Sequence, residues 1–279
     1  MKIAVIGGTG KVGRLVIDRL QDYQVRALVW TETAAAGLRE QTDAELAHAD
    51  LDEPSTLGPA LKGIDTLFIA TPFHPQQTSR ELAAVEAAEE AGVSRLVKVS
   101  SYAAGVRPTV PSAAAHIAVE ARLRRSTMQW SALRPDWWLD NILTQLDHVR
   151  EGETFYPAGS AVVTAVDARD LADVAVAEIV ADVPAGGSLI LTGPESVTLA
   201  EVAERLGRAV NAPMVLRDDV APDWPDYYAE GMRRLFASYR DRGFAPRTHT
   251  IEEVLGKPAR SIEQFATEVL QPALSKANP

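Results

Sequence analysis

Short apolar runs alternate with longer amphipathic stretches through the first 135 residues. The apolar runs have the length and β-branched content of buried strands, and apolar residues between them recur at helical spacing. Predicted strands cover 1–6, 25–29, 45–49, 66–70, 95–99 and 130–133. Predicted helices cover 11–20, 34–41, 54–61, 76–91 and 113–125. This alternation predicts an α/β fold with a doubly wound, parallel, Rossmann-type sheet and helices on both faces.

The alternation loosens beyond about residue 150. Predicted strands at 162–166 and 188–191 flank a helix over 170–180, and further helices are predicted over 198–209, 222–243 and 261–269. Thr198 and Glu201 have the spacing of a capping box at the start of one of these helices. We therefore expect a Rossmann domain over 1–192, which contributes part of a substrate pocket from about 135–160. A smaller C-terminal α/β lobe over 193–279 would cover the substrate.

A glycine motif lies between the first predicted strand and the first predicted helix. Gly7, Gly10 and Gly13 would let the backbone turn tightly and approach a pyrophosphate, while the helix N-terminus supplies free N–H groups. The alternative is a glycine-rich turn that serves only the packing of the helix on the strand. The position of the motif favours a dinucleotide site and makes 1–192 an NAD(P)-binding domain.

Composition narrows the classes of partner. The formal net charge of −10 argues against non-specific binding to nucleic acid, and the absence of cysteine excludes disulfides, thiolate catalysis and thiolate metal sites. The five histidines are scattered, so no metal site is expected. No run reaches the length of a membrane span, and the first strand follows Met1 directly. We expect a cytoplasmic protein with a small-molecule partner and no nucleic-acid or membrane partner; its oligomeric state stays open, with a homodimer as one outcome.

Ligands of open parallel sheets lie beyond the carboxyl ends of the strands. At those ends Asp50 and Leu51 would border the adenine, and residues 70–73 would border the nicotinamide ribose. The residues expected to bind the dinucleotide are Gly7, Thr9, Gly10, Lys11, Val12, Gly13, Trp30, Asp50, Leu51, Ala70, Thr71, Pro72, Ser100, Arg134 and Pro135.

Several segments resemble the NmrA-like branch of the atypical short-chain dehydrogenases/reductases. They are GGTGKVGR at 7–14, LVKVSSYAA at 96–104, AAHIAVEARLRRS at 114–126, WSALRPDWWLDNI at 130–142, VDARDLADVA at 166–175 and VLGKPARSIEQFATE at 254–268. The resemblance implies a Rossmann fold and NAD(P)H binding. It includes quinone reductases and a triphenylmethane dye reductase.

Membership of this branch would leave the chemistry open, because the usual Tyr-x-x-x-Lys pair is missing. His116 and Glu120 stand on the corresponding helix. We expect hydride transfer to a quinone, aromatic or conjugated small molecule, with His116 as proton donor or substrate anchor and Tyr102 as the second catalytic candidate. Glu120 would orient the helix or pair with Arg124, four residues later. The alternative is a surface helix with ion pairs and no catalytic role.

Aromatic residues after the fourth and sixth predicted strands suggest a substrate pocket. The residues assigned to it are Phe73, Trp137, Trp138, Asn141 and Tyr156. The alternative for one of the two tryptophans is packing under the C-terminal lobe.

The sequence indicates the form of the cofactor and the type of function only in part. The resemblance implies NADP(H) as the usual cofactor. Trp30, however, stands at the end of the second strand, where many relatives carry an arginine that can contact the 2′-phosphate, so NAD(H) is the alternative. Two other functions also stay open. One is a non-catalytic NAD(P)-sensing regulatory protein, and the other is a biosynthetic enzyme that uses the fold for non-redox chemistry.

Overall fold

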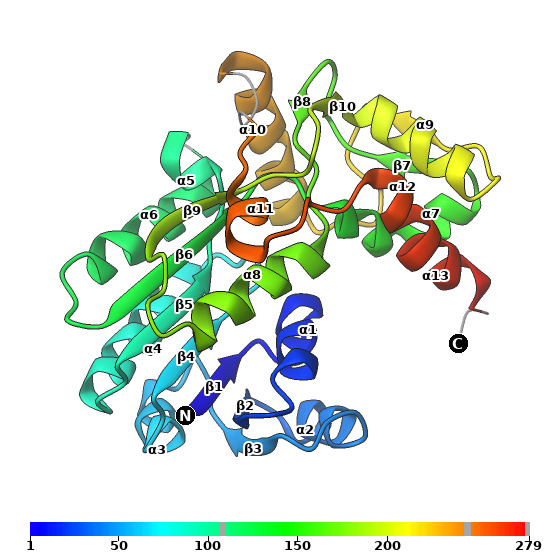
Figure 1. Cartoon of the computed structure of the whole chain (residues 1–279). Helices are drawn as coiled ribbons and strands as arrows, with labels where there is room; N and C mark the ends of the chain where they lie inside the picture. The colour runs from blue at the N-terminus through cyan, green and yellow to red at the C-terminus, as the bar shows by residue number, and fades with distance from the viewer. Residues whose placement is uncertain (107–109, 243–246, 277–279) are drawn as a thin grey trace. The chain divides into compact units, whose positions relative to one another are not determined.

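The apolar runs of the N-terminal half pair into a seven-stranded sheet. The structure is a computed structural model that describes residues 1–106, 110–242 and 247–276. The strands of this sheet are β1 (Lys2–Ile6), β2 (Gln24–Val29), β3 (Glu45–His48), β4 (Thr66–Ile69), β5 (Arg95–Val99), β6 (Gln129–Pro135) and β9 (Gly187–Leu191). Their order is β3-β2-β1-β4-β5-β6-β9 (Figure 1).

The pairings among β1 to β6 are all parallel, as predicted. Val5 of β1 lies between Ala27 of β2 and Phe68 of β4, and Leu96 of β5 pairs with Trp130 of β6. The chain moves outward from β1 to β3 and then returns to place β4 on the other side of β1. This reversal is the switch point at which a doubly wound sheet binds its ligand. The predicted α/β fold class is confirmed.

Helices cover both faces of this sheet. They are α1 (Lys11–Arg19), α2 (Glu32–Arg39), η1 (Pro54–Thr56), α3 (Leu57–Leu61), α4 (Gln77–Glu90), α5 (Ala103–Val106), α6 (Pro111–Leu123) and α8 (Ala168–Val180). Helices α3, α4 and α6 bury their apolar residues in one cluster with Ala4, Ile6 and Leu67 of the sheet. On the other face, Arg19 of α1 bonds Asp173 of α8 (Figure 1).

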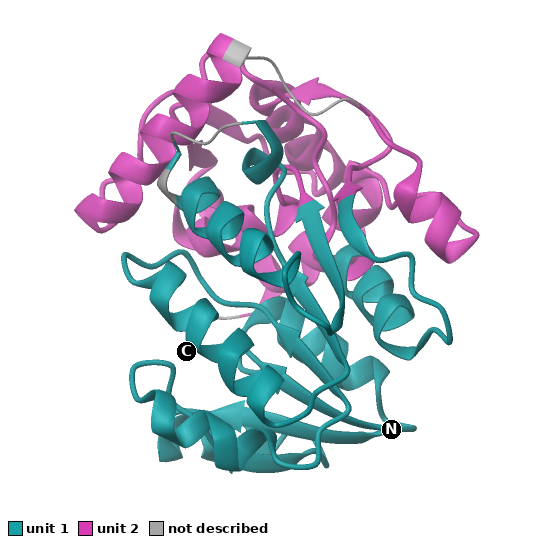
Figure 2. Cartoon of the chain, turned by 90° about the vertical axis from the view of Figure 1, so that its left-hand side faces the viewer, with its two compact units in different colours: residues 1–134, 171–189 teal, residues 135–170, 190–279 magenta. Residues whose placement is uncertain are grey.

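The chain divides into two compact units, coloured separately in Figure 2. Unit 1 comprises 1–134 and 171–189, and unit 2 comprises 135–170 and 190–279. The residues at 135–170 therefore cluster with the C-terminal part of the chain, although the sequence placed them in the first domain. The division predicted at residue 192 is functional: residues before it would bind the cofactor, and residues after it would cover the substrate. These two roles stay predictions.

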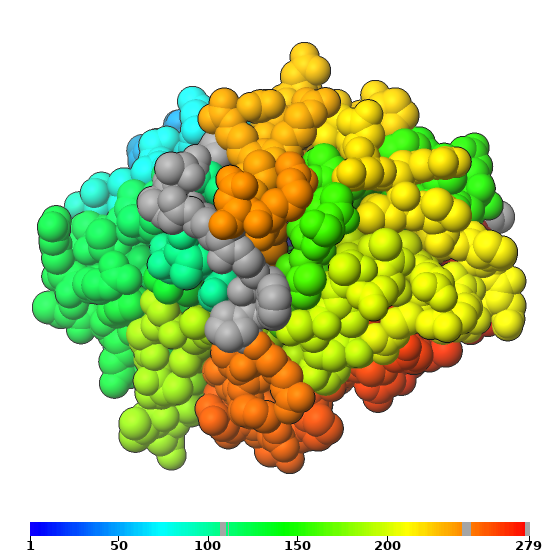
Figure 3. All heavy atoms as spheres, turned by 90° about the horizontal axis from the view of Figure 1, so that it is seen from above, coloured from blue at the N-terminus to red at the C-terminus, as the bar shows by residue number. Residues whose placement is uncertain are grey.

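Unit 2 contains short strands and several helices. Its elements are η2 (Leu139–Gln145), α7 (Leu146–Arg150), β7 (Glu153–Phe155), β8 (Val162–Val163), β10 (Val197–Thr198), α9 (Leu199–Ala209), β11 (Val215–Arg217), α10 (Asp226–Arg242), α11 (Thr250–Leu255), α12 (Ile262–Phe265), the π-helix η3 (Ala266–Leu270) and α13 (Gln271–Ser275). Strand β8 pairs antiparallel with β10, and β11 pairs parallel with β7. Helices α9 and α10 both reach the surface on the face shown in Figure 3.

Two predictions for this part of the chain had different outcomes. The capping box of Thr198 and Glu201 is present at the start of α9. The strand predicted over 162–166 is only two residues long and lies outside the main sheet. It ends there because the backbone N–H and hydroxyl of Thr164 donate to the buried carboxylate of Asp136. Among the described residues, no helix is long and apolar enough to cross a membrane.

Buried carboxylates tie the start of α8 to the end of the chain within unit 2. Asp170 accepts from the backbone N–H of Arg260 at 2.7 Å and also pairs with its guanidinium. Arg169 joins the fully buried Asp167 to Glu268. Burial raises the pKa of Asp170 above its ordinary value, although the contacts with Arg260 oppose that shift. Asp167 also accepts from the backbone N–H of Arg169 at 2.8 Å, so it caps the start of α8 as well as pairing with a cation.

The turn between β1 and α1 is packed too tightly for side chains at two of its glycines. Gly7 has a φ of +87°, and a Cβ there would lie 2.0 Å from the carbonyl oxygen of Ala70. A Cβ on Gly13 would lie 2.1 Å from the carbonyl oxygen of Gly7. Gly13 therefore allows α1 to pack closely against the end of β1.

We expect Gly13→Val to destabilise the protein by more than about 2 kcal/mol, because the backbone of the turn would have to move. Gly37→Ala is the matched control, since a Cβ at this helical glycine meets nothing within 4 Å. That control should stabilise the protein by about 0.5–1 kcal/mol. Denaturant unfolding measures both, and equal effects of the two substitutions would contradict the packing role of Gly13.

Candidate functional site

The loop after β1 leads into the N-terminus of α1, where a helix presents backbone N–H groups to an anion. Gly10 is exposed and occupies the N-cap of α1, where it makes no side-chain capping bond. The first turn of α1 contains no acidic residue, so nothing offsets the positive end of the helix dipole. A Cβ at Gly10 would meet only the carbonyl oxygen of Gly7, at 3.2 Å. This open cradle fits the pyrophosphate of a dinucleotide.

The neighbouring predicted cofactor residues differ in how they could take part. Thr9 and Lys11 are exposed beside Gly10, whereas the side chain of Val12 is buried in the core. Val12 could therefore contact a cofactor only through its backbone.

Other predicted cofactor residues follow the neighbouring strands of unit 1. Trp30, directly after β2, is 62% exposed, which is unusual for so large an aromatic side chain. Asp50 and Leu51 follow β3 and are half-buried. Ala70, Thr71 and Pro72 follow β4. Because β1 to β4 are parallel neighbours, these residues lie along one edge of the sheet, and their binding role stays a prediction.

Glu120 of α6 is the centre of a buried polar cluster in unit 1. Its carboxylate accepts hydrogen bonds from Ser100 at 2.7 Å, from Nε of Arg134 at 3.0 Å and from Ser188 at 2.9 Å, and it pairs with Arg124 at 3.2 Å. Burial acts to raise the pKa of Glu120, but the bonds from Arg134 and Ser100 hold it below its ordinary value. The predicted pairing with Arg124 is confirmed. Ser100 and Arg134, predicted to bind the cofactor, both donate to this carboxylate.

A second buried polar cluster joins α4, β5 and α6. Lys98 of β5 is fully buried, and its Nζ lies 2.8 Å from Oε2 of Glu81 and 3.0 Å from Nδ1 of His116. The other oxygen of Glu81 accepts from Thr71 and, at 2.9 Å, from Gln77. Burial would raise the pKa of Glu81, but the charge of Lys98 and the hydrogen bond from Thr71 hold it below its ordinary value. We call Thr71, Gln77, Glu81, Lys98 and His116 the Lys98 cluster.

The environment of His116 keeps its imidazole neutral. Burial and the ammonium of Lys98 lower its pKa from 6.5 to about 3. His116 is 8% exposed, and Glu120, on the same helix, is fully buried. The helix face that carries both side chains is therefore buried rather than at the surface, and the ion pairs of the alternative are present at Glu120, with Arg124 and Arg134. The catalytic role of His116 stays a prediction.

Sequence reasoning missed Lys98 and Glu81. A lysine between Val97 and Val99 in a strand buried on both faces was the available signal, because parallel strands of such sheets are continuously apolar. Tyr102, the other catalytic candidate, is buried just before α5 and keeps that role as a prediction.

The aromatic residues assigned to a substrate pocket have different surroundings. Trp137 and Tyr156 are buried in the core of unit 2, with their rings edge-to-face at 5.4 Å. Nε1 of Trp137 is buried without a hydrogen-bond partner among the described residues. Trp138 and Asn141 are half-buried in unit 2, and Phe73 is half-buried after β4 in unit 1. The alternative for Trp137 and Trp138 is that one of them packs in the protein interior under the C-terminal lobe. Trp137 has such buried surroundings, in the core of unit 2.

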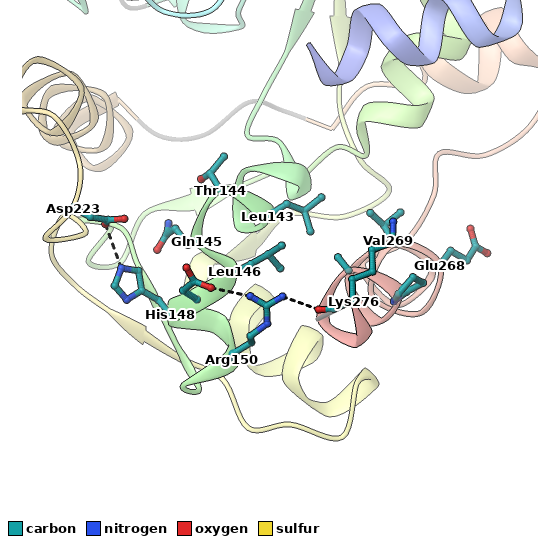
Figure 4. Close-up of a pocket in the computed structure, with 13 residues that line it drawn as sticks. Leu143, Thr144, Gln145, Leu146, His148, Arg150, Asp223, Glu268, Val269 and Lys276 are labelled. Atoms are coloured by element: carbon teal, nitrogen blue, oxygen red, sulfur yellow. Dashed lines mark hydrogen bonds and ion pairs between the residues drawn. The ribbon is translucent and has the colours of Figure 1, made fainter. Parts of the chain in front are cut away.

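A hollow of about 870 Å³ opens between η2–α7 and η3–α13 in unit 2 (Figure 4). Its apolar wall includes Leu143, Leu146 and Val269, and none of the predicted pocket residues lines it. Arg150 donates to Asp147 and, as the close-up shows, to the carbonyl of Lys276. No group of three or more side chains suited to a metal ion occurs in the described parts of the chain.

Comparisons with known proteins match almost the whole chain. A family model described as NAD(P)H-binding matches residues 7–182. The NAD(P)H azoreductase of Xenophilus azovorans is 32% identical over 278 residues, which cover 95% of this chain and 96% of that protein.

Solved structures share the fold. The NADPH-dependent quinone oxidoreductase of Escherichia coli in complex with NADPH superposes with a TM-score of 0.84 at 23% identity, covering 96% of this chain and 99% of that one. The triphenylmethane reductase of Citrobacter sp. in complex with NADP(H) superposes with a TM-score of 0.81 at 22% identity, with the same coverage.

The depressed pKa of His116 predicts a stability that depends on pH. Between pH 6.5 and about 3 the unfolded imidazole takes up a proton that the folded one does not, so the contribution of His116 to stability is full above pH 6.5 and falls as the pH drops. We expect wild type to lose up to about 1.4 kcal/mol per pH unit more than His116→Gln in this window. Denaturant unfolding at several pH values measures the difference, and parallel curves for the two proteins would contradict a buried, neutral His116.

Proposed function

The chain belongs to the NAD(P)H-binding family as an NmrA-like atypical short-chain dehydrogenase/reductase, and from that premise we propose which substrates it reduces and how. It is an NAD(P)H-dependent oxidoreductase. The proposed reaction is hydride transfer to an aromatic azo compound, a quinone or another conjugated small molecule. The observation that carries it is the buried, neutral imidazole of His116 on the helix that bears the Tyr-x-x-x-Lys pair in alcohol dehydrogenases.

The residues of unit 1 fit this chemistry in two ways. The glycine cradle at the start of α1 would hold the pyrophosphate of NAD(P)H, which when bound supplies the hydride. An acceptor that gains a hydride develops negative charge on an oxygen or nitrogen. A neutral imidazole can donate a hydrogen bond to that atom in a low-dielectric site and so stabilise the charge.

Unit 2 would supply contacts to the substrate. Trp138 and Asn141 are half-buried, and the unpartnered Nε1 of Trp137 is a donor that a polar group of a ligand could satisfy. Tyr156 packs against Trp137 and would hold it in place. Phe73 is the corresponding proposal from unit 1. An aromatic acceptor suits such a lining because flat rings stack on indole and phenyl faces.

The acceptor class is tested by NAD(P)H oxidation with methyl red, menadione and a triphenylmethane dye. We expect wild type to oxidise NAD(P)H with at least one of them. Gly10→Trp should lower cofactor affinity by more than about tenfold, because the indole would fill the cradle. Gly58→Trp is the matched control, since a Cβ there meets nothing within 4 Å.

Absorbance at the nicotinamide band follows turnover, and quenching of NAD(P)H fluorescence follows binding. Cofactor binding without oxidation by any acceptor would contradict the reductase and favour a sensor. Unchanged binding by Gly10→Trp would contradict the assignment of the cradle.

We propose NADP(H) as the preferred form of the cofactor. No carboxylate stands at the tip of β2 to bind the 2′-hydroxyl of NAD(H), because Trp30 occupies that position and Thr31 caps α2. Trp30→Asp should shift the ratio of the two dissociation constants toward NADH by about tenfold or more. Trp30→Phe, which adds no charge, is the control. A preference for NADH in wild type would overturn the proposal.

A further inference from the structure

We propose that Lys98 is a positioning residue that fixes His116 as a neutral imidazole with its proton on Nε2. The assignment of the proton concerns the resting protein and stands on the Lys98 cluster alone. Its consequence for catalysis rests on the reductase function proposed above.

The buried position of Lys98 is costly unless specific partners compensate for the lost hydration of its ammonium. Lys98 belongs to β5, which lies between β4 and β6 in the seven-stranded sheet, and its side chain is fully buried. A buried ammonium costs several kcal/mol unless a counter-charge and hydrogen-bond acceptors surround it. Here the counter-charge is Glu81, whose Oε2 lies 2.8 Å from Nζ, and the hydrogen-bond acceptor is Nδ1 of His116 at 3.0 Å. The charge is therefore kept in the interior by two specific partners.

The other contacts of Glu81 make it the counter-charge of Lys98. Thr71 and Gln77 both donate to Oε1 of Glu81, and bonds to a carboxylate from hydroxyl and amide donors favour its ionised form. The ionised carboxylate lies 2.8 Å from Nζ of Lys98. The cluster thus places one negative and one positive charge side by side next to the imidazole.

The tautomer of His116 follows from the donor and acceptor inventory. An ammonium has three donors and no acceptor, so Nδ1 of His116 must accept the bond from Lys98. A neutral imidazole whose Nδ1 accepts carries its proton on Nε2. His116 then presents an N–H donor on the side of the ring opposite Lys98.

Charged groups from the elements packed around His116 act in both directions. Glu81 from α4 and Glu120 from α6 itself favour the imidazolium, whereas Lys98 from β5 and Arg134 from β6, together with burial, favour the neutral ring and outweigh them. The carboxylate of Glu120 is already bonded to Arg134, Ser100 and Ser188, so it offers little to an imidazolium. The nearest charge to the ring nitrogen is the ammonium of Lys98, which repels a second positive charge.

The consequence for the proposed reaction is a hydrogen-bond donor that does not change with pH near neutrality. Nε2–H would meet the oxygen or nitrogen on which the acceptor develops charge. Loss of Lys98 would free Nδ1 to carry the proton, and the remaining carboxylate of Glu81 would then favour an imidazolium.

The direct test is ¹⁵N NMR of the full-length protein labelled at histidine, with His116→Gln to assign the ring signals. We expect Nδ1 of His116 to resonate as a pyridine-type nitrogen and Nε2 as a protonated, pyrrole-type nitrogen. Both signals should stay constant between about pH 5 and pH 8. A proton on Nδ1, or an imidazolium in this range, would overturn the proposal even if variants at Lys98 failed to fold.

The variant Lys98→Met/Glu81→Gln removes both charges and leaves an amide oxygen for Thr71. We expect the protonated nitrogen signal to be shared between Nδ1 and Nε2. For an acceptor that wild type reduces, kcat should fall at least about tenfold, with KM for NAD(P)H within about twofold of wild type. An unchanged tautomer in the folded variant would overturn the role of Lys98.

The matched control is Arg122→Met/Glu89→Gln, which removes another ion pair between α4 and α6. Its His116 signals should equal those of wild type, and a shift like that of the Lys98 variant would assign the effect to helix packing and contradict the proposal.

The experiments distinguish failure of the reductase function from failure of the proposed role of Lys98. Wild type that shows the Nε2 proton but reduces no acceptor contradicts the reductase function only. Wild type that reduces an acceptor with the proton on Nδ1 contradicts the role of Lys98 only.

Discussion

The ammonium of Lys98, buried in β5, is tolerated only because partners from other elements reach it, and this requirement determines how the polar residues of unit 1 are arranged. Lys98 holds Glu81 from α4 and His116 from α6, while Glu120 binds Ser100 after β5 and Arg134 at the end of β6. Removal of one partner would leave an uncompensated charge in the interior, which costs about 3–5 kcal/mol. The two clusters therefore fix the register of α6 against the strands more specifically than apolar packing alone.

Binding and chemistry are built from different kinds of interaction in this chain. The cradle at α1 depends on backbone geometry, where Gly7 and Gly13 permit close packing and Gly10 leaves the start of the helix without a side chain. The candidate chemical group depends on side-chain electrostatics, where Lys98 and burial keep His116 neutral. The same cradle could therefore be retained by proteins that catalyse different reactions or none, while the polar clusters change.

The sheet was predictable from sequence because buried parallel strands are apolar and short, and each helix between them shows its period. Much of the site was not. The i,i+4 spacing of His116 and Glu120 shows that they share a helix face but not whether that face is buried. Lys98 and Glu81 are far apart in sequence, so their pairing depends on tertiary packing. The clustering of 135–170 with the C-terminal part likewise depends on non-local contacts, such as that between Asp136 and Tyr239.

The pairs that anchor the start of α8 also limit how the chain can be rearranged. Asp170 is satisfied by Arg260, and Arg169 reaches Glu268, so residues near the end of the chain neutralise groups about a hundred positions earlier. A truncation before residue 260 would leave Asp170 buried and unpaired. The C-terminal segment consequently cannot be exchanged on its own: a chimera that replaces it must bring a cation to Asp170 and an anion to Arg169, or replace those two residues as well.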